Sequence, residues 1–191
     1  MNEEQLYRMI LQNDYAEYVQ YTSRGQWKKT KFHRYLCEAV QSFIETDTGH
    51  AADILVLSVP PQHGKSVTIT ESLVSWYMGK HPNHSCIIAS YNTDFAERFG
   101  RRNKEKIEQY GEAIFGISVG GKSSNQEFEL DGKAGRCVSR GMLSGITGNS
   151  GHLIIIDDPL KTREEAYSQT TRDKLWEEWS FSIKSRYQDV T

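Results

Sequence analysis

The sequence has no apolar run near the ~20 residues that a membrane-spanning helix needs, and its acidic, polar first residues are unlike a secretory signal. We therefore expect no membrane partner. Cysteine is also scarce: Cys37, Cys86 and Cys137 lie far apart and form no metal-type pair. Because an odd number of cysteines argues against a disulfide framework, we expect three buried thiols in a reducing compartment.

An excess of either charge is missing as well. The chain carries 23 Lys and Arg against 25 Asp and Glu, a net charge of −2, so a broadly basic surface is excluded. Any nucleic-acid binding would need a local patch or a further domain. With 191 residues, 37% of them hydrophobic, the chain suits one sizeable globular domain and no disordered class.

Apolar strands alternate with amphipathic helices along the chain. Expected helices cover residues 3–21, 32–44, 67–78, 93–110 and 163–186, expected strands cover 53–59, 86–89 and 153–156, and a hairpin covers 128–138. This alternation predicts an α/β fold with a mainly parallel central sheet and helices on both faces. We expect residues 1–50 to form a helical lead-in packed on a core of residues 51–191.

The first motif is a short loop that follows the apolar residues 53–59 and ends in Gly64-Lys65-Ser66. In a phosphate-binding loop, backbone N–H groups cradle phosphates, the lysine reaches the outer phosphate oxygens and the serine ligates Mg²⁺. The usual first glycine of such a loop is replaced by Val59, and Pro60 and Pro61 follow it. Taken alone, the motif is also compatible with a chance loop and a solvated lysine.

The second motif is Asp157-Asp158 at the end of the aliphatic residues 153–156. In nucleotide hydrolases, the first acid of such a pair holds Mg²⁺ and the second orients or deprotonates the attacking water. Alone, the pair is also typical of a strand end before the turn at Pro159. Because the carboxyl ends of parallel strands share one edge of a sheet, the two motifs can meet, and together they predict nucleoside triphosphate hydrolysis.

Three segments carry a resemblance to a known family. They are residues 60–66, residues 89–102 with Ser90-Tyr91-Asn92 and the following arginines, and residues 155–161 with Asp157-Asp158-Pro159. With Phe32-His33 upstream, they resemble the large terminase subunit of tailed bacteriophages over about residues 25 to 185. The resemblance implies a RecA-like P-loop ATPase of the ASCE type, which drives double-stranded DNA into an empty procapsid in the host cell cytoplasm.

The resemblance also implies partners: a portal protein, a small terminase subunit and a homo-oligomeric ring when assembled, whereas the fragment alone is compatible with a monomer. ATP is the implied substrate and Mg²⁺ the implied cofactor. Family members usually carry a C-terminal nuclease, which we expect to be absent here, and the core to be truncated before its last strands.

By the same resemblance, Lys65 stabilises the β- and γ-phosphate charge, Ser66 and Asp157 hold Mg²⁺, and Asp158 takes the position often filled by a catalytic glutamate. Some members carry an arginine in the phosphate loop, where this chain has Pro61, so Arg140 becomes the candidate for a charge-stabilising arginine supplied to a neighbouring subunit. An exposed arginine on a loop is the alternative. The expected ATP-binding residues are Pro61, Gln62, His63, Gly64, Lys65, Ser66 and Val67.

Two other functions fit part of the pattern. A helicase-type ATPase lobe would require a second lobe, and its second motif usually reads Asp-Glu, where this chain has Asp157-Asp158. A non-hydrolysing nucleotide-binding assembly module is compatible with the absent first glycine. Loss of ATP turnover on Lys65→Ala distinguishes an enzyme from such a module.

Overall fold

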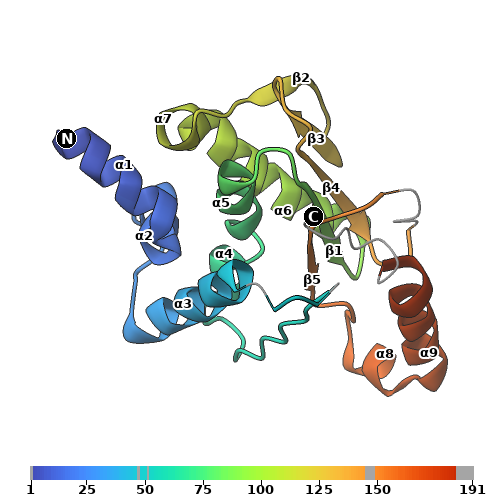
Figure 1. Cartoon of the computed structure of the whole chain (residues 1–191). Helices are drawn as coiled ribbons and strands as arrows, with labels where there is room; N and C mark the ends of the chain where they lie inside the picture. The colour runs from blue at the N-terminus through green and yellow to red at the C-terminus, as the bar shows by residue number, and fades with distance from the viewer. Residues whose placement is uncertain (1, 47, 51, 145–148, 184–191) are drawn as a thin grey trace.

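The computed structural model describes residues 2–46, 48–50, 52–144 and 149–183. Its centre is a five-stranded sheet in the order β2-β3-β4-β1-β5 (Figure 1). The strands are β1 (Ser85–Ser90), β2 (Val119–Ser123), β3 (Glu127–Leu130), β4 (Arg136–Gly141) and β5 (Leu153–Asp157). β1 pairs in parallel with β4 and β5, whereas β2, β3 and β4 pair antiparallel. The α/β class is confirmed, and the sheet is mixed rather than mainly parallel.

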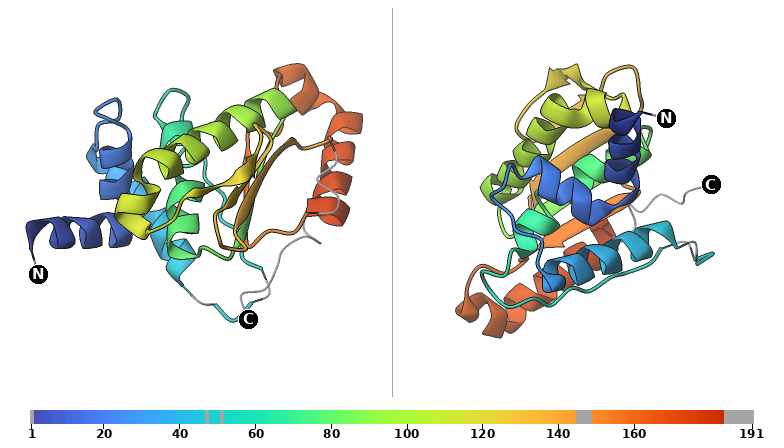
Figure 2. Two further views of the ribbon diagram at one scale, coloured as in Figure 1. Left: turned by 90° about the horizontal axis from the view of Figure 1, so that it is seen from above. Right: turned by 90° about the vertical axis from the view of Figure 1, so that its left-hand side faces the viewer.

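Helices surround this sheet. They are α1 (Glu3–Asn13), α2 (Tyr15–Thr22), α3 (Lys31–Glu45), α4 (Lys65–Thr68), α5 (Leu73–Lys80), α6 (Thr93–Lys106), α7 (Glu112–Phe115), α8 (Arg163–Tyr167) and α9 (Gln169–Glu177), with π-helical turns at Ile107–Gly111 and Glu178–Ile183. The N-terminal helices and α9 lie on opposite sides of the sheet (Figures 1 and 2). None of the helices in the described part of the chain is both long and apolar enough to cross a membrane.

Alternate side chains of β1 enter two separate buried clusters. Cys86 and Ile88 join the larger cluster with α2, α3, α5 and α6, and Ile87 and Ala89 join a smaller one, against which Trp179 packs. This alternation is what a strand covered on both faces requires. Both faces of the central strands are therefore shielded from water, as the apolar sequence of β1 indicates.

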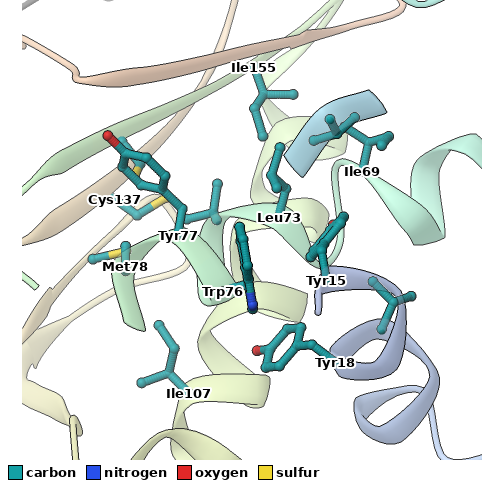
Figure 3. Close-up of a cluster of buried hydrophobic side chains, with 14 of the residues drawn as sticks. Tyr15, Tyr18, Ile69, Leu73, Trp76, Tyr77, Met78, Ile107, Cys137 and Ile155 are labelled. Carbon is teal, nitrogen blue, oxygen red and sulfur yellow. The ribbon is translucent and has the colours of Figure 1, made fainter. Parts of the chain in front are cut away.

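The larger cluster ties the N-terminal helices to the sheet. Trp76 of α5 is completely buried, and its ring lies 5.1 Å from that of Tyr15 in α2 (Figure 3). The hydroxyl of Tyr18 donates to Ser75 Oγ at 2.8 Å. Ile155 of β5 belongs to the same cluster, so α2, α5 and the strand that ends at Asp157 share one core.

The expected strand over residues 53–59 is wrong. The structure gives this segment no regular secondary structure, and Ile54 and Val56 are 64% and 83% exposed. Apolar residues favour a strand only where a neighbouring strand offers hydrogen-bond partners. Among the described strands, β5 is at the edge of the sheet and pairs only with β1, and residues 53–59 do not join its free side.

Three expected helices are interrupted, two of them at a local side-chain cap and one beside a long-range side-chain hydrogen bond. Asp14 ends α1 and caps α2 by accepting from the Glu17 amide, and Ser168 separates α8 from α9 by accepting from the Thr171 amide. Between α4 and α5, the side chain of buried Asn103 donates to the Thr70 carbonyl at 2.7 Å. Such side-chain bonds replace helical backbone bonds. Residues 184–186 of the last expected helix lie outside the described residues.

The expected hairpin and the expected burial of the cysteines are both confirmed. The hairpin is confirmed, since β3 and β4 pair antiparallel with Phe128 opposite Cys137. All three cysteines are buried. Trp176 and Trp179 stand three residues apart, a spacing that suits one helix face, yet Trp176 is 68% exposed whereas Trp179 packs against the small cluster.

A column of histidines lies at the other end of β1 and β5 from the two motifs. The rings of His81 and His84 stack at 4.8 Å, and those of His84 and His152 stack at 4.1 Å. The Ser85 amide donates to His152 Nδ1, and the Tyr77 hydroxyl bonds His84 Nδ1. Burial, followed by the charges of the neighbouring histidines, lowers the pKa of His84 to about 4.

This column makes stability depend on pH. The folded protein holds His84 neutral below the ordinary histidine pKa of about 6.5, whereas the unfolded chain takes up a proton there, so stability falls as the pH drops toward about 4. The charged groups that face the column are Lys80 and Glu45, which are bonded to each other.

Replacing His84 by glutamine tests this dependence. When the pH is lowered from about 7 to about 5, the free energy of unfolding should fall less in His84→Gln than in the wild type. The difference should be on the order of 1 kcal/mol, because solvent screens the half-buried rings, and thermal unfolding at the two pH values measures it. Equal losses in both proteins would contradict this account.

Candidate functional site

The two motifs meet at the carboxyl ends of the strands. Lys65 Nζ lies 2.9 Å from Asp157 Oδ1 and 2.6 Å from Asp158 Oδ1. Ser66 Oγ donates to Asp157 Oδ2 at 3.3 Å. Asp157 ends β5 opposite Ser90 of β1, so the parallel register fixes one side of the site and the first turn of α4 supplies the other.

The two carboxylates lie in different surroundings. Asp157 is buried, with 6% of its side chain exposed, whereas Asp158 is 68% exposed. A buried carboxylate needs a charged or hydrogen-bonded partner, and Lys65 and Ser66 satisfy one oxygen each. Burial alone would lower the pKa of Lys65, but its hydrogen bonds to Asp158 and Asp157 outweigh burial and raise that pKa.

An open pocket of ≈ 480 Å³ adjoins this cluster. Its lining contains six of the seven expected ATP-binding residues together with Asp158. The residues that line it are Val59, Pro60, Pro61, Gln62, Gly64, Lys65, Ser66, Val67 and Asp158. His63 is the expected residue that does not line it: its side chain is exposed, and Nδ1 lies 2.8 Å from the Pro61 carbonyl oxygen.

Left-handed backbone surrounds the pocket. Gln62 has φ 63°, Gly64 has φ 75° and Asp158 has φ 45°. Glycine adopts this conformation freely, whereas Gln62 and Asp158 store strain of roughly 1–3 kcal/mol each. Such strain persists only where surrounding contacts hold the backbone, and for Asp158 the bond to Lys65 is such a contact.

Two residues upstream of the loop hold it in place. Trp27 is buried and donates from Nε1 to Thr68 Oγ1 at 2.9 Å, and His33 Nε2 lies 3.1 Å from the His63 carbonyl oxygen. Trp27 therefore bonds α4 as well as packing in the core. His33 was noticed only as part of the resemblance. Thr30, which caps α3 and contacts His33 Nδ1, is the sequence signal that places this imidazole at the helix start.

Arg140 lies apart from this cluster in the single chain. It stands on β4, which β1 separates from β5. Its Nη1 donates to the carbonyl oxygens of Ser139 and Gln126 at 3.0 and 3.3 Å. Arg140 does not line the pocket, so its charge-stabilising role stays a prediction that needs a second subunit.

The donor set fits a hard divalent cation. Ser66 and Asp157 offer hydroxyl and carboxylate oxygens, which Mg²⁺ prefers. Within the described ranges, no group of three or more His, Cys, Asp or Glu side chains could hold a metal alone. A site with one or two carboxylates completed by phosphate oxygens and waters is how Mg²⁺ is usually held beside nucleotides.

Comparison with known proteins identifies one family. A family model described as terminase large subunit, T4likevirus-type, N-terminal, matches residues 56–185. The match spans both Lys65 and Asp157-Asp158. A comparison with curated proteins found no match.

The close approach of Gly64 to His33 can be tested through stability. A Cβ atom added at Gly64 would lie 2.8 Å from His33 Nε2, in a backbone with φ 75°, so Gly64→Ala should cost about 2–3 kcal/mol. Gly25 is the matched control: its φ is 77°, but nothing lies within 4 Å, so Gly25→Ala should cost only about 1–2 kcal/mol. Urea denaturation measures both. Identical losses, or no recovery when His33→Ala is added to Gly64→Ala, would show that the imidazole contact costs nothing.

Proposed function

The chain belongs to the family of terminase large-subunit N-terminal domains, and on that basis we propose that it is the ATPase motor domain of a viral DNA-packaging terminase. In this proposal the domain is a RecA-like P-loop ATPase that hydrolyses ATP to move double-stranded DNA into a procapsid. The observation that carries the proposal is the convergence of Lys65 and Ser66 with Asp157 and Asp158 beside an open pocket.

Each of these side chains has a distinct task in ATP hydrolysis. The Lys65 ammonium neutralises charge on the β- and γ-phosphate oxygens as it develops in the transition state. Ser66 and Asp157 would hold Mg²⁺, which when bound neutralises phosphate charge. Asp158 is exposed to the pocket and is the carboxylate that can orient the attacking water and accept its proton.

Backbone N–H groups are the other half of the proposed phosphate site. The left-handed Gly64 turns the chain into α4, and the first helical residues, Lys65 to Val67, line the pocket, where their backbone amides are the proposed phosphate donors. Trp27 and His33 hold this turn from α3 and the segment before it. The N-terminal helices thus contribute to the proposed ATP site by positioning its loop.

Double-stranded DNA is the molecule that the proposed motor moves. Because the net charge of the chain is −2, binding of DNA would depend on a local cluster of positive side chains. Arg98 lies over the Phe95 ring at 5.0 Å and Lys161 over the Tyr91 ring at 6.0 Å. Both cations stand just beyond the strand ends that carry the proposed ATP site. They support a contact with phosphate there. The portal protein, the small terminase subunit, the homo-oligomeric ring and the host cytoplasm are proposed on the family relationship.

ATP turnover tests the enzymatic part. Lys65→Ala removes the cation that faces the transferred phosphate and should lower the turnover rate by about 10²–10³-fold. Lys133→Ala is the control, since Lys133 lies in the exposed turn between β3 and β4 and should leave the rate unchanged. Phosphate release by purified protein with Mg²⁺ and ATP measures the rate. Binding of ATP without turnover under all conditions, including assembled rings, would favour a non-hydrolysing nucleotide-binding module.

Arg140 requires a separate test in assembled rings. If a neighbour uses Arg140 to stabilise transition-state charge, Arg140→Ala should lower the ring's turnover by about 10³-fold or more. Its stability should change little, since Arg140 is only partly buried and its side chain donates to two carbonyl oxygens without forming an ion pair within the described part of the chain. Arg136→Ala, at the other end of β4, is the control. An unchanged rate in the Arg140→Ala ring would assign the charge-stabilising role to another residue.

A further inference from the structure

We propose that Lys65 is also the internal counter-ion of the divalent-cation site, and that it makes the binding of metal depend on the prior binding of nucleotide phosphate. The inference rests on the proposed function and deepens it, since it concerns the order in which the same site is filled. Without nucleotide, the Lys65 ammonium supplies the positive charge beside Asp157 that the divalent cation would otherwise supply.

The geometry leaves Asp157 fully engaged by the chain itself. Its Oδ1 bonds Lys65 Nζ at 2.9 Å and its Oδ2 accepts from Ser66 Oγ at 3.3 Å. Both residues expected to hold Mg²⁺ therefore bond each other, and the carboxylate already has a cation. A divalent ion that entered this state would stand close to the ammonium, so it would have to displace Lys65 from the carboxylate.

Asp158 forms a second ion pair with Lys65. Its Oδ1 lies 2.6 Å from Lys65 Nζ, in a residue held at φ 45°. Because Asp158 is 68% exposed, water screens this contact more strongly than that of Asp157. The buried Asp157 therefore decides the competition between lysine and metal, and Asp158 adds a weaker hold.

Nucleotide changes this balance because phosphate offers the lysine a better partner. The pocket beside Lys65 is open, and the β- and γ-phosphates carry more negative charge than one carboxylate. When Lys65 turns to phosphate, Asp157 loses its internal cation, and Asp157 and Ser66 become available as ligands for a divalent ion. Binding of nucleotide and binding of metal are then coupled, and by linkage each strengthens the other to the same extent.

Metal binding without nucleotide tests the proposal directly. Free Mn²⁺ can be counted by electron paramagnetic resonance while nucleotide-free protein is titrated. Wild type should bind Mn²⁺ weakly, and Lys65→Met, which keeps the length of the side chain and removes its charge, should bind it about tenfold more tightly. Lys65→Gln is measured in parallel, so that the result does not depend on one variant folding.

Two controls isolate the lysine. Lys133→Met removes one positive charge far from the site and should leave Mn²⁺ affinity as in the wild type. Adding Asp157→Asn to Lys65→Met should abolish the gain, because it removes the carboxylate that the lysine had occupied. An affinity that is the same in the wild type and in both Lys65 variants overturns the proposal, as does a gain that survives Asp157→Asn.

These outcomes are independent of ATP turnover. Wild-type protein that hydrolyses ATP, with Mn²⁺ affinity unchanged in the Lys65 variants, would overturn the counter-ion role and leave the motor function standing. Tighter Mn²⁺ binding in the variants of a protein that never hydrolyses ATP would support the counter-ion role and contradict the motor function.

Discussion

The buried carboxylate of Asp157 is the constraint around which the site is organised. The sheet carries this one acid to the end of an apolar strand, where water cannot solvate it well. A charge in that position is tolerated only if the fold brings it a partner. Lys65 and Ser66 are those partners, and they can reach Asp157 only if the loop that precedes α4 is held against the end of β5. Tyr15 of α2, Trp27 and His33 of α3 help to meet this requirement, since they bond α4 or the loop before it.

The sequence was sufficient to predict that the residues of the candidate site lie together. Lys65 and Asp157 each follow an aliphatic run, and the expectation that they meet at one edge of a sheet agrees with their contact of 2.9 Å. The strand over residues 53–59, however, was inferred from apolarity alone. Apolar side chains report a tendency toward burial, but a strand also needs a partner for its backbone, and only the arrangement of the whole sheet determines whether one exists.

Long-range contacts explain the remaining differences. The break between α4 and α5 depends on Asn103, a residue of α6 whose side chain takes backbone groups of Thr70 and Ser75. No local sequence pattern predicts the bond between Asn103 and Thr70, because the two residues are 33 positions apart in the chain. Trp176 and Trp179 share the spacing of a buried face, yet only Trp179 has a surface to cover. Periodicity thus indicates which side chains can be buried together, and the number of facing elements decides how many are.

The free edge of β5 has a consequence for how the domain behaves in solution. The domain also exposes Ile54 and Val56, two β-branched residues in a segment that joins no strand. An unpaired strand edge and an exposed apolar segment are the two features that lead proteins to associate through intermolecular sheets. We expect the domain to resist aggregation best at low protein concentration, or with a polar substitution at Val56. The Val56 side chain is 83% exposed and contributes to no core. The same strand that ends at the buried Asp157 thereby presents an edge that favours aggregation.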